Sequence, residues 1–369
     1  MRMQRLAYAM FYVALVLAII VLCNTRTEQQ APRFVVADDL DINLNHPYEE
    51  SSVLIPEPGY LLASHAATFT LLGNGDLLAL WFAGSSEGAS DVKIWSSRFA
   101  NNHWSMAVPV VSPEMLSQNL GFFVKKLGNP VVYRDPHTHI LHLLVVSVGG
   151  VGGWAVSNLN HLYSYDEGKS WGLPTRLILS PGFNISTLDR TLPVPLQDGG
   201  FYVPVYYELL YKYPELLRFD ASGALVAQSR INTQHDLLQP ALVVLNEHEA
   251  LAFFRNAGKH NNLLYMQSTN DGGRTWSRPV ATNLRNYDSS IAVTKINKAL
   301  LMVHNVGPGR GKLVISVSDD GITWKTLLVL EDTPHQEFSY PVIIAHQSMV
   351  DILYTWKRKA IKHVRILWK

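Results

Sequence analysis

Residues 269–276 read TNDGGRTW, and the same pattern occurs as SYDEGKSW at 164–171 and as VSDDGITW at 317–324. Each octet has Asp at the third position, Gly at the fifth, Ser or Thr at the seventh and Trp at the eighth. An Asp that accepts backbone N–H groups, a Gly with positive φ and a Trp folded over the turn describe a tight hairpin turn. Apolar alternation precedes two copies, in NLLYMQS (262–268) and KLVISVS (312–318). The octets therefore predict one strand–turn–strand unit, written three times.

The spacing of the octets predicts a ring of repeated sheets. Their Trp residues lie 105 and 48 residues apart, so the larger gap holds about two of the smaller. The stretch 218–228, RFDASGALVAQ, supplies the missing turn without a Trp, and 96–111 supplies an earlier one with Trp104. Units of roughly 50–65 residues are typical of propeller blades. With strands of a sixth unit in 337–367, and an early strand near 33–45 to close it, the sequence predicts an all-β, six-bladed propeller.

The N-terminus differs in kind from the rest of the chain. Residues 6–23, LAYAMFYVALVLAIIVLC, are uncharged and mostly apolar, and as a helix they would span roughly 27 Å. Arg2 and Arg5 precede them, which predicts a cytoplasmic N-terminus. We expect a stub and transmembrane anchor over 1–30 and a single propeller domain over 31–369, held on the extracytoplasmic side of the membrane. A cleaved signal peptide is the alternative, and it also exports the propeller.

Composition excludes several classes of function. The 369 residues carry a formal net charge of +1 without a basic stripe, which argues against a nucleic-acid partner. The basic run at 357–362, KRKAIK, is interpreted as a strand end. Cys23 is the sole cysteine, so there is no disulfide framework and no thiolate metal site. Nucleotide-binding and metalloprotease motifs are absent from the sequence, and we expect neither a metal nor a cofactor.

The octets resemble the Asp boxes of sialidases and related proteins with bacterial neuraminidase repeats (BNR repeats). The resemblance covers roughly residues 55–367, with 65–98 (HAATFTLLGNGDLLALWFAGSSEGASDVKIWSSR) opening the first blade and the stretch from EFSYPVII (337–344) closing the last. It implies Asp boxes on the outside of the propeller and a site at the centre of one face. Because one fold hosts many functions, activity has to be argued from that site.

A sialidase holds the carboxylate of its substrate with three arginines, and the planar guanidinium fork suits that task. The resemblance implies that Arg255 and Arg310 are the second and third of these arginines. The first is missing, because the chain reads SHAATF where an arginine is expected, and His65 or Ala66 stands in its place. His65 is a candidate hydrogen-bond donor or base.

The resemblance also implies the catalytic groups. Glu87 lies near the loop position of the sialidase acid/base aspartate, with Asp91 as the alternative. Tyr340 matches the tyrosine nucleophile, which avoids bringing a carboxylate against an anionic sugar. Glu337 is a carboxylate alternative to Tyr340, and Glu208 is the candidate partner of the tyrosine.

A further argument needs no family. Inner strands of a propeller begin near the central channel, so polar residues at their ends would converge on one pocket. Such a ring suits a hydroxylated or anionic ligand. The residues that recur at about blade spacing are His65, Asn129, Arg190, Gln239, Arg255, Asn305, Arg310 and Tyr340.

These observations favour a glycan-active enzyme at the extracytoplasmic side of a membrane, an exo-glycosidase acting on acidic sugars. A lyase on uronate-containing glycans is a second hypothesis, with His65 or a tyrosine as proton carrier. A non-catalytic propeller that binds glycan is a third hypothesis, and a purely structural propeller with a filled channel is a fourth.

Overall fold

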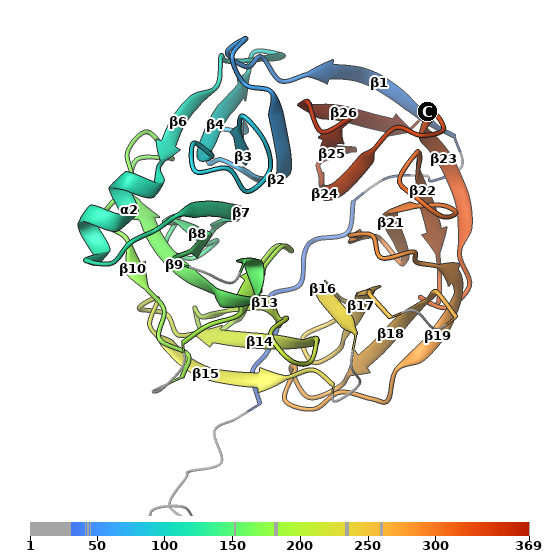
Figure 1. The fold of residues 1–369 in the computed structure, drawn as a ribbon. Coiled ribbons are helices and arrows are strands. Elements are labelled where there is room, and N and C mark those ends of the chain that lie inside the picture. The colour runs from blue at the N-terminus through green and yellow to red at the C-terminus, as the bar shows by residue number, and fades with distance from the viewer. Residues whose placement is uncertain are drawn as a thin grey trace, which may run out of the picture.

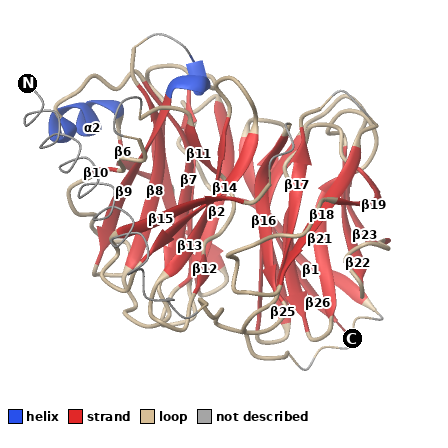
Figure 2. Ribbon diagram, turned by 90° about the horizontal axis from the view of Figure 1, so that it is seen from below, coloured by secondary structure: helices blue, strands red, loops and turns tan. Residues whose placement is uncertain are grey.

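Six antiparallel sheets surround a central channel (Figure 1). The computed structural model describes residues 31–368 except 41, 43, 45, 151–152, 181–183, 233–235 and 259–260. Figure 2 shows the strands lying side by side, with α2 (Pro113–Leu120) and a second short helix, η1 (Gly153–Val156), at one end. The six sheets confirm the predicted six-bladed propeller.

The blades follow one another in chain order. Blade 1 comprises β2 (Ala63–Leu71), β3 (Leu77–Gly84), β4 (Lys93–Ala100), β5 (His103–Trp104) and β6 (Val108–Val111). Blade 2 comprises β7 (Lys126–Arg134), β8 (Leu141–Val148), β9 (Ser157–Ser164) and β10 (Thr175–Arg176). In blade 3, β11 (Thr187–Asp189) and β12 (Val194–Pro195) both pair with β13 (Phe201–Tyr207), followed by β14 (Tyr213–Phe219) and β15 (Leu225–Arg230).

The second half repeats the plan. Blade 4 comprises β16 (Leu237–Val244), β17 (Ala250–Asn256), β18 (Leu263–Thr269) and β19 (Val280–Arg285). Blade 5 comprises β20 (Ala292–Ile296), β21 (Ala299–Asn305), β22 (Lys312–Ser318) and β23 (Lys325–Asp332). Blade 6 comprises β24 (Phe338–His346), β25 (Met349–Trp356) and β26 (Ala360–Trp368), and its outer strand is β1 (Pro47–Leu54).

The ring closes where the two ends of the chain pair, but not with the residues expected. Strand β1 pairs with β26 from Pro47 opposite Trp368 to Leu54 opposite Lys362, so a closing strand at 33–45 is wrong. The segment from residue 31 instead crosses the channel (Figure 1). At its start, between blades 3 and 4, the amide of Phe34 donates to the carbonyl of Glu247 at 2.8 Å, and the Phe34 side chain is fully buried. Burial of that ring fixes the segment against blades 3 and 4 before the closing strand begins.

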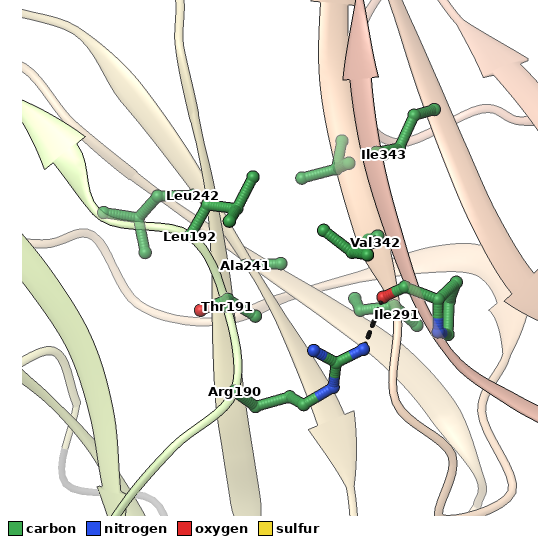
Figure 3. Close-up of a pocket in the computed structure, with 11 residues that line it drawn as sticks. Arg190, Thr191, Leu192, Ala241, Leu242, Ile291, Val342 and Ile343 are labelled. Carbon is green, nitrogen blue, oxygen red and sulfur yellow. Dashed lines mark hydrogen bonds between the residues drawn. The ribbon is translucent and has the colours of Figure 1, made fainter. Parts of the chain in front are cut away.

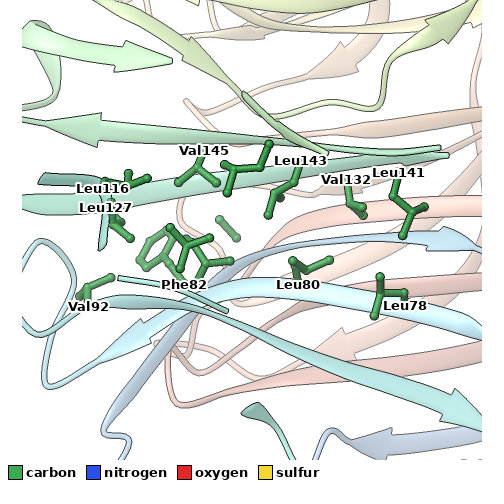
Figure 4. Close-up of a cluster of buried hydrophobic side chains, with 14 of the residues drawn as sticks. Leu78, Leu80, Phe82, Val92, Leu116, Leu127, Val132, Leu141, Leu143 and Val145 are labelled. Carbon is green, nitrogen blue, oxygen red and sulfur yellow. The ribbon is translucent and has the colours of Figure 1, made fainter. Parts of the chain in front are cut away.

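The hydrophobic core is divided into six clusters, one between each pair of neighbouring blades. Strand β3 shows why its sequence, LLALWFAG, is apolar without alternation: all eight residues are buried. Successive side chains of a strand point to opposite faces. Leu78, Leu80 and Phe82 therefore pack against blade 2 (Figure 4), while Leu77 and Trp81 pack against blade 6.

The Asp boxes join the third and fourth strands of blades 2, 4 and 5. In the first, Asp166 accepts from the Ser170 amide at 2.9 Å and the Ser170 hydroxyl at 2.6 Å, and these bonds lower the pKa of Asp166 to about 2. The third box is one residue shorter than its octet suggests. There Asp320, not Asp319, accepts from the amide of Thr323 at 2.7 Å. The degenerate copy at 218–228 forms the corresponding turn of blade 3.

The predicted anchor lies outside the described residues. Within the part of the chain that the structure describes, none of the helices has the length and apolar character needed to cross a membrane.

Candidate functional site

A pocket of about 150 Å³ opens beside the channel and draws residues from five of the six blades. Of the predicted site residues, Glu87, Asn129, Glu208, Arg255 and Tyr340 line it. These five are up to 253 positions apart in sequence, and the closed ring brings them together. The remaining lining residues are Phe82, Val146, Trp154, Leu188 and Tyr206.

Bulges interrupt three inner strands beside the pocket and change the direction of the side chains there. The pairing register of β2, β16 and β24 shifts at Ala66, Gln239 and Tyr340, whose φ angles are 54°, 47° and 53°. Non-glycine residues rarely adopt positive φ, and such outliers cluster at functional sites. Proline follows two of them, at 240 and 341, and lacks the N–H that a continuous ladder would use.

Tyr340 is enclosed by cationic and aromatic groups. Arg255 Nη1 donates to its hydroxyl at 3.1 Å, and the His65 ring lies 4.3 Å away, centroid to centroid. The guanidinium carbons of Arg190 and Arg310 lie 5.3 and 5.5 Å from the centre of the Tyr340 ring, within the range of cation–π attraction. Burial lowers the pKa of His65 well below its usual value, so the imidazole is neutral at pH 7.

Arg190 holds β24, the strand that carries Tyr340, against β2. Its guanidinium donates to the carbonyls of Ala67 at 3.1 Å and Pro341 at 2.9 Å, and also to that of Tyr340. Figure 3 shows it at the edge of an otherwise mostly apolar channel lining. Burial lowers the pKa of Arg190 to about 10, which still leaves it charged at neutral pH. Main-chain carbonyls of β2 and β24 accept from both terminal nitrogens of Arg190, which favours a structural role over the predicted contact with substrate.

Glu337 joins two arginines from different blades. It accepts from Arg310 Nη1 at 2.8 Å and from Arg358 Nε at 2.6 Å, and Ser339 donates a third bond at 2.7 Å. Burial alone would raise the pKa of Glu337, but these donors lower it to about 2. Glu337 is thus the counter-ion of two arginines and does not line the pocket, which favours Tyr340 over Glu337 as the nucleophile.

Arg358 is the main residue that sequence reasoning missed. It lies in the turn between β25 and β26, within the run interpreted as a strand end, and Nη1 donates to Glu87. Its hydrogen bonds to Glu337 and Glu87 raise its pKa, against the effect of burial. The signal available was a cluster of three cations, Lys357 to Lys359, at one strand end.

The position of Arg255 is set by Asp288, which was also missed. Arg255 Nε donates to Asp288 Oδ1 at 2.7 Å, and its side chain is 13% exposed. Burial opposes the charge of Arg255, yet Tyr340 and Asp288 raise its pKa above the usual value. The ion pair orients one side of the guanidinium fork and leaves the other side to face the pocket beside Tyr340.

Glu208 and Tyr206 form the wall beside Arg255. Burial raises the pKa of Glu208, which makes its carboxylate a stronger base than an exposed one. Burial also raises the pKa of Tyr206, whose hydroxyl accepts from Gln239 Nε2 at 3.2 Å. Gln239 therefore reaches the site through Tyr206 and does not line the pocket itself.

Two further candidates stand outside the pocket lining. Asp91 accepts from the amide and hydroxyl of Ser85 at 3.0 and 2.9 Å, which closes the base of the loop that carries Glu87. Asn305 donates to the carbonyls of Phe338 at 2.8 Å and Lys312 at 3.1 Å. Neither residue lines the pocket, and the contacts described here lie within the fold, so their substrate-binding roles stay predictions.

Comparison with known proteins defines the class. The family of BNR repeat-like domains matches residues 75–352, and the chain belongs to that family. No curated protein sequence matches the chain. The fold is that of a sialidase-like BNR propeller.

Solved structures agree on this fold at low sequence identity. A protein of unknown function from Dyadobacter fermentans aligns with a TM-score of 0.74 and 11% identity, over 88% of this chain and 100% of its own. The Hadza microbial sialidase Hz136 aligns with a TM-score of 0.70 and 17% identity, over 82% of this chain and 65% of its own. The leech intramolecular trans-sialidase aligns with a TM-score of 0.66 and 13% identity, over 86% of this chain and 70% of its own.

Proposed function

We propose that the chain is a glycan-active enzyme that removes terminal acidic sugars. The observation that carries the proposal is that Tyr340, Glu87 and Arg255 line one small pocket. Its volume of about 150 Å³ suits a single terminal unit, since pockets for larger ligands run from roughly 300 Å³ upward. Sialidases among the structural neighbours share this fold, which makes a glycan the natural partner.

In the proposed reaction the Tyr340 oxygen attacks the anomeric carbon and the glycosidic oxygen leaves. Glu87 gives that oxygen its proton, and Glu208 accepts the proton of the tyrosine hydroxyl. Water then attacks the anomeric carbon and gives a proton to Glu87, while Glu208 returns its proton to the departing Tyr340 oxygen, so that all three groups regain their starting state. Arg255 and Arg310 attract the substrate carboxylate.

A lyase acting on uronates is a second candidate, favoured by one observation. Arg255 donates to the Tyr340 hydroxyl, and guanidinium groups of Arg190 and Arg310 lie near the ring. This cationic surrounding suits a tyrosine that abstracts a proton beside a carboxylate held by arginine.

The experiment incubates the full chain in detergent with glycans ending in sialic or uronic acid, alongside Glu87→Gln and Arg255→Ala. We expect the native chain to release sugar and both variants to lose release, while the control Arg230→Gln, on an outer strand, retains it. An unsaturated, ultraviolet-absorbing product would identify the lyase. Glycan binding without any product would reduce the proposal to a binding propeller.

We also propose that residues 6–23 anchor the propeller, residues 31–369, at the extracytoplasmic side of a membrane. The support is the length and apolar character of that run. The chain in native membranes should resist alkaline carbonate extraction, and Leu15→Arg should abolish this while Gln29→Arg does not. Release of a chain shortened by about 25–30 residues would instead indicate a cleaved signal peptide.

A further inference from the structure

Arg358 contacts two carboxylates of different character. Its Nε donates to Glu337 at 2.6 Å, and its Nη1 donates to Glu87 across the gap between blades 6 and 1. The side chains of Arg358 and Glu87 are 41% and 35% exposed, whereas that of Glu337 is 24% exposed. Exposed ion pairs are weakly held and exchange partners readily. The Glu87 contact is therefore the one that can open.

The contact with Glu337 holds Arg358 in place while the other contact changes. Glu337 is fixed by Arg310 and Ser339 as well as by Arg358, and its pKa is lowered to about 2. The Nε end of the guanidinium thus has a permanent partner. Its Nη end can pass from one carboxylate to another without the side chain having to reorganise.

Glu87 separates Arg358 from the pocket. Glu87 lines the pocket and Arg358 does not, so movement of Glu87 would open the part-exposed guanidinium to a ligand inside the pocket. Glu87 lies at the tip of a loop whose base is closed by Asp91 and Ser85, and Gly88 follows with a φ of 79°. The charged and titratable groups that face Glu87 are Arg358, Lys126, Asp91 and, across the pocket, Glu208, Arg255 and Tyr340.

We propose that an anionic substrate group displaces Glu87 from Arg358, and that the released Glu87 then takes up a proton from solvent and becomes the acid of the reaction. A carboxylate that loses its cationic partner binds a proton more tightly. A neutral sugar leaves the Glu87–Arg358 pair intact, so Glu87 is not released for proton transfer. Arg358 thereby determines specificity for anionic sugars. This inference rests on the proposed function and names the charge of its substrate.

The coupling is measured as proton uptake on binding, which does not require turnover. The full chain in detergent is titrated calorimetrically at pH 7 with N-acetylneuraminate and with glucuronate, in buffers of different ionisation enthalpy. The methyl esters of both sugars are the uncharged controls. We expect uptake of up to about one proton with the better-binding anion and none with the esters.

Variants separate coupling from simple charge attraction. Arg358→Gln should weaken anion binding by about tenfold to a hundredfold and abolish proton uptake. Glu87→Gln should abolish uptake but keep or improve binding, because a competitor for Arg358 is removed. Arg358→Lys keeps the charge and should retain part of the uptake. Arg230→Gln, at a distant exposed arginine, should change neither quantity.

Three outcomes would overturn the inference: anion binding without proton uptake, uptake that survives Arg358→Gln in a chain with a native melting profile, or no binding of either anion. Failure of the proposed function looks different. Binding and coupled uptake without any sugar release would refute the enzyme and leave the Arg358 switch standing.

Discussion

Two carboxylates of blade 6, Asp351 and Glu337, each gather basic partners, yet they lie in opposite settings. Asp351 is fully buried and accepts from His346 and His363 at 2.7 Å and from Arg365 Nε at 2.8 Å. Glu337 is 24% exposed and holds Arg310 and Arg358 beside a pocket. The first cluster lies inside the fold, and the second reaches the pocket through the contact of Arg358 with the lining residue Glu87.

This difference teaches that an arginine–carboxylate pair indicates a binding site only when some guanidinium donors remain available to a ligand. The buried network of Asp351, whose three basic partners all lie in blade 6, is costly to break. The part-exposed cluster of Glu337, Arg310 and Arg358 should add little to stability, and its arginines can attract an anionic ligand. Substitutions should therefore affect stability at one cluster and activity at the other.

The largest effect is expected at Tyr340. Tyr340→Phe removes the hydroxyl that contacts Arg255 and should lower kcat by at least about 10³-fold, as loss of a nucleophile does. Initial-rate kinetics measure the loss of turnover, and a melting curve checks that the variant keeps its stability. Tyr165→Phe, at a side chain that is 80% exposed, is the matched control with native kinetics. Near-native turnover by Tyr340→Phe would remove Tyr340 from the chemistry.

Asp351→Ala should produce the largest loss of stability. It leaves His363 and Arg365 buried without their partner and should cost about 3–5 kcal/mol in the free energy of unfolding. Urea unfolding at pH 7 measures it, with Asp332→Asn as an exposed control. Turnover below the melting range should stay within about threefold of native. A collapse of activity without a loss of stability would contradict the assignment.

The same cluster predicts how stability depends on pH. Burial would raise the pKa of Asp351, but bonds from His346, His363 and Arg365 lower it well below its usual value. The unfolded pKa is about 3.9, so the stabilisation is complete above about pH 5 and declines as the pH falls through 4 and below. The difference in unfolding free energy between the native chain and Asp351→Asn should shrink over that range. A difference that stays constant down to pH 3 would rule this out.

An intermediate effect is expected at Arg255. Arg255→Lys keeps a positive charge but loses the planar fork that spans Asp288 and Tyr340. KM for an anionic substrate should rise by about tenfold to a hundredfold, with a smaller change in kcat. Steady-state kinetics check this, and an unchanged KM would show that the carboxylate binds elsewhere.

The smallest effect is expected at an Asp box. Asp271→Asn disturbs acceptor bonds from the Thr275 amide and hydroxyl, at 2.9 and 2.6 Å in a partly exposed turn. The melting temperature should fall by no more than about 2 °C, with kinetics unchanged. A large change in kcat would link the Asp boxes to the site, which the geometry separates.

The architecture could be predicted because its signal is local. An Asp box needs only eight consecutive residues to form its turn, and three copies at blade spacing imply the ring. The closing strand is an error of another kind: it begins at Pro47, because burial of Phe34 between blades 3 and 4 decides where the preceding segment is held. The third box uses Asp320 in place of Asp319, a choice between two adjacent aspartates that the octet pattern does not resolve.

The site was predicted in part. Five candidates, including Glu87, Arg255 and Tyr340, lie in one pocket because inner-strand ends must meet at the channel. Arg190 and Asn305 sit at similar strand ends but turn to main-chain carbonyls. Polarity at a strand end does not reveal which acceptor lies within reach.

The sequence by itself determined the repeat and the all-β class, because turn geometry and strand periodicity depend on neighbours along the chain. Only the tertiary structure decided which cations face the pocket. Arg358 reaches Glu87 from 271 positions away, and that contact exists only because the ring closes blade 6 against blade 1. Charge pairing across the chain follows distance in space, and spacing in the sequence does not record it.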